Sequence, residues 1–103
     1  MHGKQKRQLE KELEAKLCEK LESLGAMALK FVSPGKAGVP DRLVLIPYGH
    51  IAFVELKRPG EKLRPLQAYT IQKIKARGFP VFIIDGEKSL NDFLSVVRGW
   101  MRI

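Results

Sequence analysis

The stretch FVELKRPG carries an acidic and a basic side chain, Glu55 and Lys57, at the end of an apolar run. The residues before it are apolar, β-branched or aromatic, a pattern typical of a strand buried on both faces. Side chains two apart on a strand project from the same face, so Glu55 and Lys57 would emerge together. Asp41 is expected at the start of the strand paired with theirs. An Asp, a Glu and a Lys therefore converge at one end of the predicted sheet.

These three side-chain types suit the hydrolysis of a phosphodiester bond. The reaction needs a hard divalent cation on carboxylate oxygens, an activated water, and positive charge against the developing phosphorane. Asp41 and Glu55 would hold the metal, and Lys57 would position or deprotonate the water. The structural alternative is an edge-strand ion pair between Glu55 and Lys57, with Asp41 as a turn residue after Pro40.

Composition limits the class of protein. A chain of 103 residues is expected to form a single domain over 1–103. With 45% hydrophobic and 29% charged residues it is neither disordered nor membranous. The charged start and the lone Cys18 predict a cytoplasmic location, without a signal peptide or an internal disulfide. The formal net charge of +8 predicts an anionic partner, most commonly a nucleic acid.

The chain alternates between helical and extended patterns in the order α-β-β-β-α-β-α. The predicted helices cover 4–24, 65–77 and a segment from Ser89, and the predicted strands cover 26–33, 42–47, 50–57 and 79–85. Leucines at three- and four-residue spacing mark the first helix, and Ser89 with Asp92 predicts a capping box for the last. A hairpin followed by a helical crossover and another strand predicts an α/β fold with a mixed sheet flanked by helices.

The motif PD at 40 and 41, followed by ELK at 55 to 57, resembles the PD-(D/E)XK nuclease superfamily, whose restriction-endonuclease-like core has this element order. The stretch KFVSPGKAGVPDRLVLIPYGHIAFVELKRPGEKLRPLQ is similar to the small stand-alone VRR-NUC nucleases of phages and bacteria. The resemblance implies a Mg²⁺-dependent DNA endonuclease in which Mn²⁺ substitutes. It further implies a homodimer that cleaves branched DNA, such as Holliday junctions, in a bacterial or phage-infected cell.

The resemblance also assigns further site residues. Gln67 matches the family's glutamine near the scissile phosphate, and the backbone carbonyl of Leu56 would join the two carboxylates as a metal ligand. A glutamate of the first helix would complete the metal shell. On the helical wheel Glu14 lies at the edge of the leucine stripe, and Glu10 lies on nearly the same side one turn earlier. Glu14 is the predicted ligand and Glu10 is the alternative.

Six basic residues flank the predicted site in loops and at strand ends, where they would follow a phosphate backbone. They are Lys30, Lys36, Arg42, Arg58, Lys62 and Arg64. Two other functions remain open at this point. One is a non-catalytic basic module that binds nucleic acid, and the other is a flap, nicking or restriction-like nuclease with the same chemistry.

The turn between the second and third strands is constrained by this chemistry. Only alternate residues of a strand share a face, so Asp41 faces the same side as Glu55 only if the connection has an odd length. A three-residue loop over 48–50 would pair Asp41 with Lys57. We expect a type I turn with a bulge there, with Gly49 near left-handed φ, or else a compensating bulge close to Asp41.

Overall fold

The computed structural model describes the backbone of residues 6–102 and the side chains of residues 9–102. Its elements are α1 (Lys6–Ser23), β1 (Met27–Lys30), β2 (Arg42–Ile46), β3 (His50–Leu56), α2 (Pro65–Ala76), β4 (Val81–Ile84) and α3 (Glu87–Met101). This order confirms the prediction, although residues 4 and 5 of the predicted first helix lie outside the described residues. No helix in the described part of the chain has the length and apolar composition that crossing a bilayer requires.

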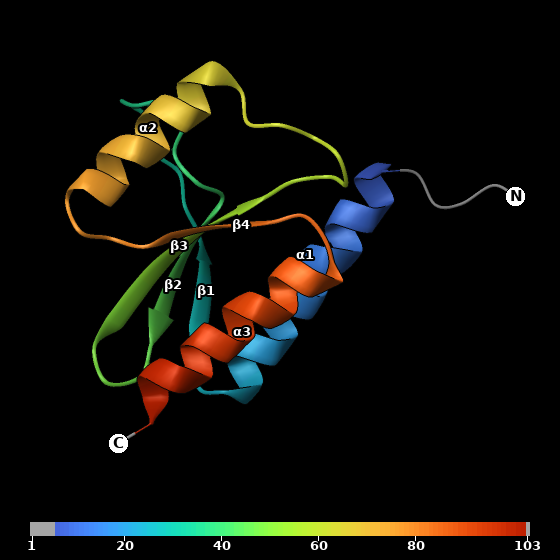
Figure 1. Ribbon diagram of the computed structural model, residues 1–103, viewed down its shortest axis with the longest axis vertical. Coiled ribbons are helices and arrows are strands. Elements are labelled where there is room, and N and C mark those ends of the chain that lie inside the picture. Colours follow the sequence, from blue (N-terminus) through green and yellow to red (C-terminus); the bar gives the residue numbers. More distant parts are fainter. Residues whose placement is uncertain (1–5, 103) are drawn as a thin grey trace, which may run out of the picture.

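A four-stranded sheet in the order β1-β2-β3-β4 forms the centre of the molecule (Figure 1). β2 pairs antiparallel with both β1 and β3, and β4 runs parallel to β3, so the sheet is mixed as predicted. In Figure 1, α1 and α3 lie along one side of the sheet and α2 lies on the other. The parallel pair needs a crossover connection, which α2 supplies.

The hydrophobic core lies between the sheet and the two helices α1 and α3. Alternate residues of β3, Ala52, Val54 and Leu56, are buried on this face together with Leu17 of α1 and Phe93 of α3. Full burial of a side chain of this size stabilises a fold by about 1.5 to 3 kcal/mol. This packing holds β3 in place, so the residues between the core positions project from a firmly anchored strand.

The opposite face of the sheet is covered by α2 at one end only. Glu55 and Lys57 project from this face because they alternate with the core residues of β3. At the other end, Met27, Leu45 and Ile51 stand side by side across three strands. Their exposed fractions are 55, 37 and 38%. One half of this face therefore presents polar chemistry, and the other half presents exposed apolar side chains.

The β2–β3 connection is three residues long, covering 47–49, which confirms the predicted odd length. It begins one residue earlier than predicted, because Ile46 pairs with His50. Residue 47 is a proline, which has no N–H to donate to the ladder and belongs in the turn. Continued by one residue, the observed register places Asp41 opposite Glu55, two residues from the partner that the sequence predicted.

The turn itself differs from the expected type. Gly49 has a φ of 83°, in the left-handed region as predicted. Tyr48 also has a positive φ of 71°, whereas both central residues of a type I turn have negative φ. The predicted type I turn is therefore wrong, and a non-glycine residue adopts the left-handed conformation beside the glycine.

The start of α3 also differs from the prediction. The helix begins at Glu87, so Ser89 lies inside its first turn and is not the N-cap residue. The Ser89 hydroxyl oxygen accepts the backbone N–H groups of Asp85 at 3.0 Å and Gly86 at 3.2 Å. The predicted capping box between Ser89 and Asp92 is therefore wrong, because Ser89 satisfies donors that precede it in the chain.

Candidate active site

Three buried polar side chains form one hydrogen-bonded cluster where β3 meets α2. Gln67 Nε2 donates to Glu55 Oε2 at 3.0 Å, and Lys57 Nζ donates to Gln67 Oε1 at 2.8 Å. Lys57 Nζ and Glu55 Oε2 are 3.4 Å apart, and the two side chains are only 6 and 3% exposed. Buried charges are costly unless they are paired and hydrogen-bonded, and here each charge meets both the other and the amide.

The start of α2 fixes the position of Gln67. Pro65 is the first residue of the helix, as predicted, where its fixed φ and missing N–H are accommodated. Gln67 Oε1 accepts the backbone N–H of Arg64 at 3.0 Å in addition to the Lys57 ammonium. The side-chain oxygen thus caps the helix, and the amide nitrogen is left to face Glu55.

Asp41 lies at the start of β2 and borders the same strand end. Its Oδ2 accepts the backbone N–H of Leu56 at 2.9 Å, while the Leu56 side chain is buried in the core on the other face. The Leu56 carbonyl, a metal ligand predicted from the sequence, is therefore part of the backbone segment that contacts the Asp41 carboxylate. Asp41 itself is exposed, and the preceding Pro40 is fully buried, so the carboxylate is anchored from behind and open to solvent.

A close backbone contact holds the loop that carries Asp41. Gly38 has a φ of 84°, and a Cβ at this position would lie 2.8 Å from the Leu66 carbonyl oxygen and 2.9 Å from Thr70 Oγ1. Thr70 Oγ1 also donates to the Ala37 carbonyl oxygen at 3.1 Å. Only glycine permits this approach of the loop to α2. The loop before β2 and the helix that carries Gln67 are therefore held together.

Glu55 has an electrostatic environment unlike that of an ordinary surface carboxylate. Burial, followed by the negative charge of Asp41, raises the pKa of Glu55 from 4.5 to about 7, although the Lys57 ammonium acts in the opposite direction. One oxygen of this carboxylate, Oε1, is buried without a hydrogen-bond partner. A buried acceptor without a partner lowers the stability of the fold by about 1 to 3 kcal/mol. A bound ligand that contacts this oxygen would remove that penalty.

The donor set fits a hard divalent cation. A cation beside Asp41 and Glu55 would offset their mutual repulsion and satisfy Glu55 Oε1, and oxygen is the donor that Mg²⁺ prefers. The two carboxylates form a pair and not a larger cluster. Across the described side chains, no group of three or more His, Cys, Asp or Glu residues comes together as a metal site.

The two glutamates proposed from the first helix have different neighbours. Glu14 Oε2 accepts Arg42 Nη2 at 2.8 Å and Nε at 3.1 Å, so this carboxylate already has a charged partner. Glu10 Oε2 lies 3.9 Å from Arg58 Nε, next in sequence to Lys57. Glu10 and Lys57 also line the same pocket. Glu10 therefore neighbours the end of β3, whereas Glu14 is paired with the residue that follows Asp41 in the chain.

The six basic residues predicted to contact DNA differ in their exposure and in their protein partners. Arg42 is only 16% exposed and donates to Glu14 and to the Ala28 carbonyl oxygen, so it has protein partners. The Arg58 side chain is 44% exposed. The remaining four residues are exposed around the site: Lys30, Lys36, Lys62 and Arg64.

Two pockets lie beside β3, one at its end and one at its middle. The first, which we call the acidic pocket, has a volume of about 220 Å³, and its charged lining residues are Glu10, Glu12, Lys16, Lys57, Asp85 and Glu87. The second, which we call the basic pocket, has a volume of about 320 Å³, and its lining includes Phe31, Phe53, Lys36, Lys73, Ile74 and Arg77. The sequence reasoning did not identify the basic pocket. Its helical residues recur at three- and four-residue spacing along α2, which is the signal that could have revealed it.

Comparisons with known proteins show the family and the fold. The family model of the VRR-NUC domain matches residues 2–88. The chain is 45% identical over 89 residues to the protein named "Putative nuclease p44" of Acyrthosiphon pisum secondary endosymbiont phage 1, covering 86% of this chain and 95% of that protein. A solved structure described as a VRR_NUC domain superposes with a TM-score of 0.79 at 31% identity, covering 84% of this chain and 94% of the other. The chain belongs to the VRR-NUC family of nucleases.

Proposed function

We propose that this protein is a metal-dependent DNA endonuclease whose reaction takes place at Asp41, Glu55, Lys57 and Gln67. One observation carries the proposal: Glu55 is buried beside Asp41 with an unpartnered oxygen, and Gln67 connects it to the buried Lys57 ammonium. A structural ion pair needs neither the second carboxylate nor the unpartnered oxygen. Perturbed and buried titratable groups of this kind gather at functional sites.

Each residue has a distinct task in the proposed reaction. Asp41, Glu55 and the Leu56 carbonyl would hold Mg²⁺, or Mn²⁺ in its place, which supplies Lewis-acid polarisation of the phosphate and lowers the pKa of a bound water. The Lys57 ammonium would orient the attacking water or stabilise negative charge on the phosphate oxygens. Gln67 holds Lys57 and Glu55 at fixed positions through both ends of its amide.

The contribution of α1 can be assigned by comparing two isosteric variants. We expect Glu10→Gln to weaken Mg²⁺ binding more than Glu14→Gln, because Glu10 shares a pocket with Lys57 whereas Glu14 is paired with Arg42. Titration calorimetry of the two variants and the wild type, without DNA, measures the difference. A larger loss in Glu14→Gln would restore Glu14 as the helix ligand, and equal affinities would exclude both.

We further propose that the protein acts as a homodimer on branched DNA. The support is the exposed apolar row of Met27, Leu45 and Ile51, on the same face of the sheet as the site. Exposed apolar patches of this kind mark contact surfaces, and a twofold contact would set two sites in symmetric register for paired cuts. Sedimentation should show a wild-type dimer that Leu45→Lys converts to a monomer. Val96→Lys, at an exposed valine of α3, is the matched control.

A panel of labelled substrates tests the activity. The protein is incubated with single-stranded, duplex, flap and four-way DNA in Mg²⁺, in Mn²⁺ and in EDTA. We expect cleavage in either metal, none in EDTA, and the fastest cleavage on four-way junctions. Preferred cleavage of flaps or nicked duplex would keep the chemistry and change the substrate. DNA binding without cleavage in either metal would indicate a non-catalytic binding module. We propose the cytoplasm of a bacterial or phage-infected cell as the location of the protein, and the support is the relative from a phage.

A further inference from the structure

The basic pocket lies on the same side of the sheet as the proposed active site and continues from it. Phe53 lines this pocket and lies two residues before Glu55 on the same face of β3, a separation of about 7 Å along the strand. Thr70 lines it from α2, one turn after Gln67. A DNA strand that reaches the exposed Asp41 carboxylate beside the end of β3 would therefore meet this pocket within one or two nucleotides.

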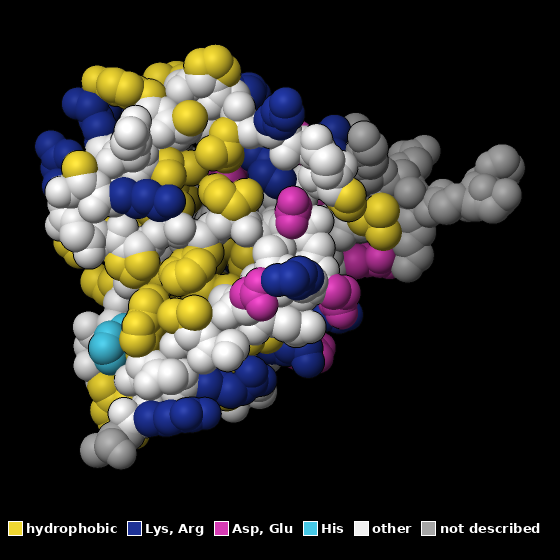
Figure 2. All heavy atoms as spheres, viewed as in Figure 1, with side chains coloured by type: hydrophobic (Ala, Val, Ile, Leu, Met, Phe, Trp, Pro, Cys, Tyr) yellow, Lys and Arg dark blue, Asp and Glu magenta, His cyan; other side chains and the backbone are white. Residues whose placement is uncertain are grey.

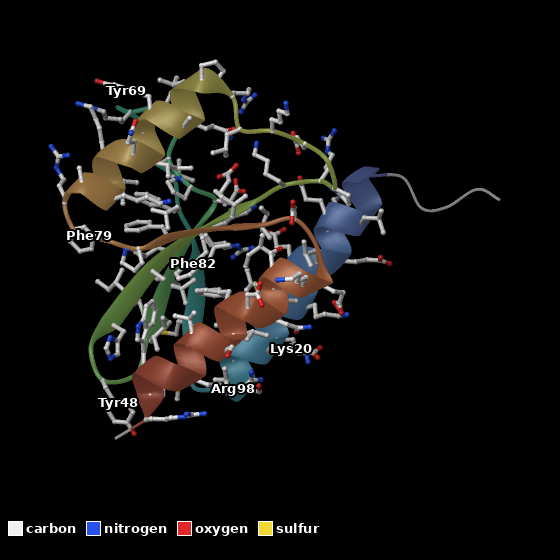
Figure 3. The ribbon with its side chains drawn as sticks, viewed as in Figure 1. Lys20, Tyr48, Tyr69, Phe79, Phe82 and Arg98 are labelled. Carbon is white, nitrogen blue, oxygen red and sulfur yellow. The ribbon has the colours of Figure 1, made fainter. Side chains whose placement is uncertain are left out.

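The floor of the pocket is aromatic. The rings of Phe31 and Phe53 have centroids 5.6 Å apart and an interplanar angle of 47°. Phe79 meets Phe53 edge-on at 6.4 Å. In Figure 3, Phe79 lies between the end of α2 and β4, whereas Tyr69 points away from the sheet on the outer side of α2. Phe31 and Phe53 are half-buried and line the pocket, so they provide a surface on which a planar ring can stack, while the exposed Phe79 supports Phe53 from outside the lining.

The rim of the pocket is cationic. Lys36 extends from the loop before β2, and Lys73 and Arg77 extend from α2, all three being exposed. None of the residues that line this pocket is acidic. The field at the rim therefore favours an anion, while the floor favours an apolar ring. Ser33 adds a hydroxyl at the wall that can donate or accept a hydrogen bond.

We propose that the basic pocket binds one unpaired nucleobase of the DNA beside the scissile phosphodiester, with the adjoining phosphates held by Lys36, Lys73 and Arg77. This inference rests on the proposed nuclease function and adds a structure-reading subsite to it. The ligand must combine an aromatic ring with flanking negative charge, which describes a nucleotide within a strand. The volume of about 320 Å³ is at the lower end of the range for small-molecule pockets.

The base must be unpaired because of the shape of the pocket. A base inside a duplex has both faces covered by its neighbours and cannot enter a recess between a helix and a sheet. A branch point or a bulge offers a base that is already unstacked, so it enters without the cost of breaking a pair. The subsite would therefore contribute to the choice of branched over regular DNA.

The first test compares two DNA molecules in EDTA, where no cleavage occurs. One duplex carries a single unpaired thymidine, and the other carries an abasic residue at the same position, so that charge and backbone are unchanged. We expect the wild-type protein to bind the first about tenfold more tightly, the effect of stacking one base on an aromatic ring. Equal affinities of the wild type for the two molecules would overturn the proposal.

A substitution that fills the pocket locates the preference. We expect Ile74→Trp to bring the two affinities to the same value, because the indole would occupy the space of the base. Val96→Trp, at the exposed valine on α3, should keep the tenfold difference. A preference that survives in a folded Ile74→Trp protein would place the base elsewhere. Equal affinities in the wild type, with a dimer that Ile74→Trp dissociates, would assign the pocket to a second copy.

A cross-linking measurement on the wild type is independent of any variant. An oligonucleotide with 5-iodouracil at the unpaired position is irradiated with the protein, and the adduct is mapped by mass spectrometry. We expect adducts at Phe31 or Phe53, and adducts only at residues outside the pocket would contradict the proposal. Cleavage of four-way DNA in Mg²⁺ separates the two levels of inference. Normal cleavage without the base preference would overturn only the subsite proposal. Absence of both DNA binding and cleavage would overturn the nuclease proposal.

Discussion

The acidic pocket adjoins β3 at Lys57, just past the strand end, and the basic pocket adjoins it at Phe53, in the middle, and the two differ in charge and origin. The acidic pocket is built from α1 and from the segment that joins β4 to α3, and it contains Glu10, Asp85 and Glu87. The basic pocket is built from the loop before β2 and from α2, and no acidic residue lines it. In Figure 2, Lys and Arg side chains lie over α2, whereas Asp and Glu side chains gather near the N-terminal half of α3, where Lys and Arg are interspersed with them.

This difference shows how one small sheet can carry a site for a cation and a separate surface for an anionic ligand. A cation site needs carboxylates in a limited space, whereas a DNA backbone needs positive charge, and mixing them would weaken both. Lys57 lies at the boundary, since it lines the acidic pocket and is hydrogen-bonded to Gln67 of α2. The division predicts that variants on the two sides will change different measurable properties.

The largest effect is expected at this boundary. Lys57→Ala should reduce cleavage by about 10² to 10⁴-fold, the usual contribution of a residue that acts on a proton or a developing charge. DNA affinity in EDTA should change little, because Lys57 is buried. Single-turnover cleavage and fluorescence anisotropy measure the two properties. Lys16→Ala is the control, since Lys16 lines the same pocket but forms an exposed ion pair with Glu87. Cleavage near the wild-type rate in Lys57→Ala would remove this residue from the reaction.

The second effect concerns stability without metal. The pKa of Glu55 is about 7 in the folded protein and 4.5 as its ordinary value, so the folded state binds the proton more tightly. This stabilisation is fully present below pH 4.5 and is lost as the pH rises through 7, a change of about 3 kcal/mol. Glu55→Gln should therefore be more stable than the wild type at pH 8 in EDTA and lose this advantage near pH 4.5. Urea unfolding at both pH values measures the difference in the free energy of unfolding between the two proteins. A difference that is independent of pH would contradict the raised pKa of Glu55.

A third comparison tests the basic side. Lys73→Gln with Arg77→Gln should weaken DNA binding by about tenfold at moderate salt and reduce the slope of log affinity against log salt by about two. The wild-type slope should be steep whether or not metal is present. Lys20→Gln with Arg98→Gln is the matched control, because Figure 3 places these residues on α1 and α3, away from α2. Equal losses in the two double variants would show that DNA binding is spread over the whole surface.

The smallest effect is expected at the hairpin between β2 and β3, which sets the register of these two strands. Gly49 has a φ of 83°, and a Cβ there would meet no atom within 4 Å, so any penalty comes from the backbone alone. Gly49→Val should lower the free energy of unfolding by about 1 to 2 kcal/mol and reduce cleavage. Gly49→Asn, which tolerates left-handed φ, should lose less. Thermal unfolding of the two variants measures their losses of stability, and equal losses would argue against backbone strain at Gly49.

Local signals in the sequence determined the element order and part of the site. Leucine spacing, glycines and prolines, and apolar runs were enough for the helices and strands, because these patterns reflect local geometry and burial. Strand periodicity was enough to predict that Glu55 and Lys57 share a face, and the odd-length hairpin was enough to place Asp41 beside them. Gln67 required the family resemblance, since one amide on a helix gives no signal by itself.

The tertiary structure decided what depends on residues far apart in the chain. The pairing of Arg42 with Glu14 joins positions 28 residues apart, and no local pattern indicates it. The unpartnered oxygen of Glu55 and its raised pKa follow from burial against α2 and Asp41. The basic pocket exists only because the Gly38 turn brings the loop before β2 against α2. Sequence periodicity fixes which face a side chain takes, but packing alone fixes which neighbour it meets, because that neighbour comes from another element.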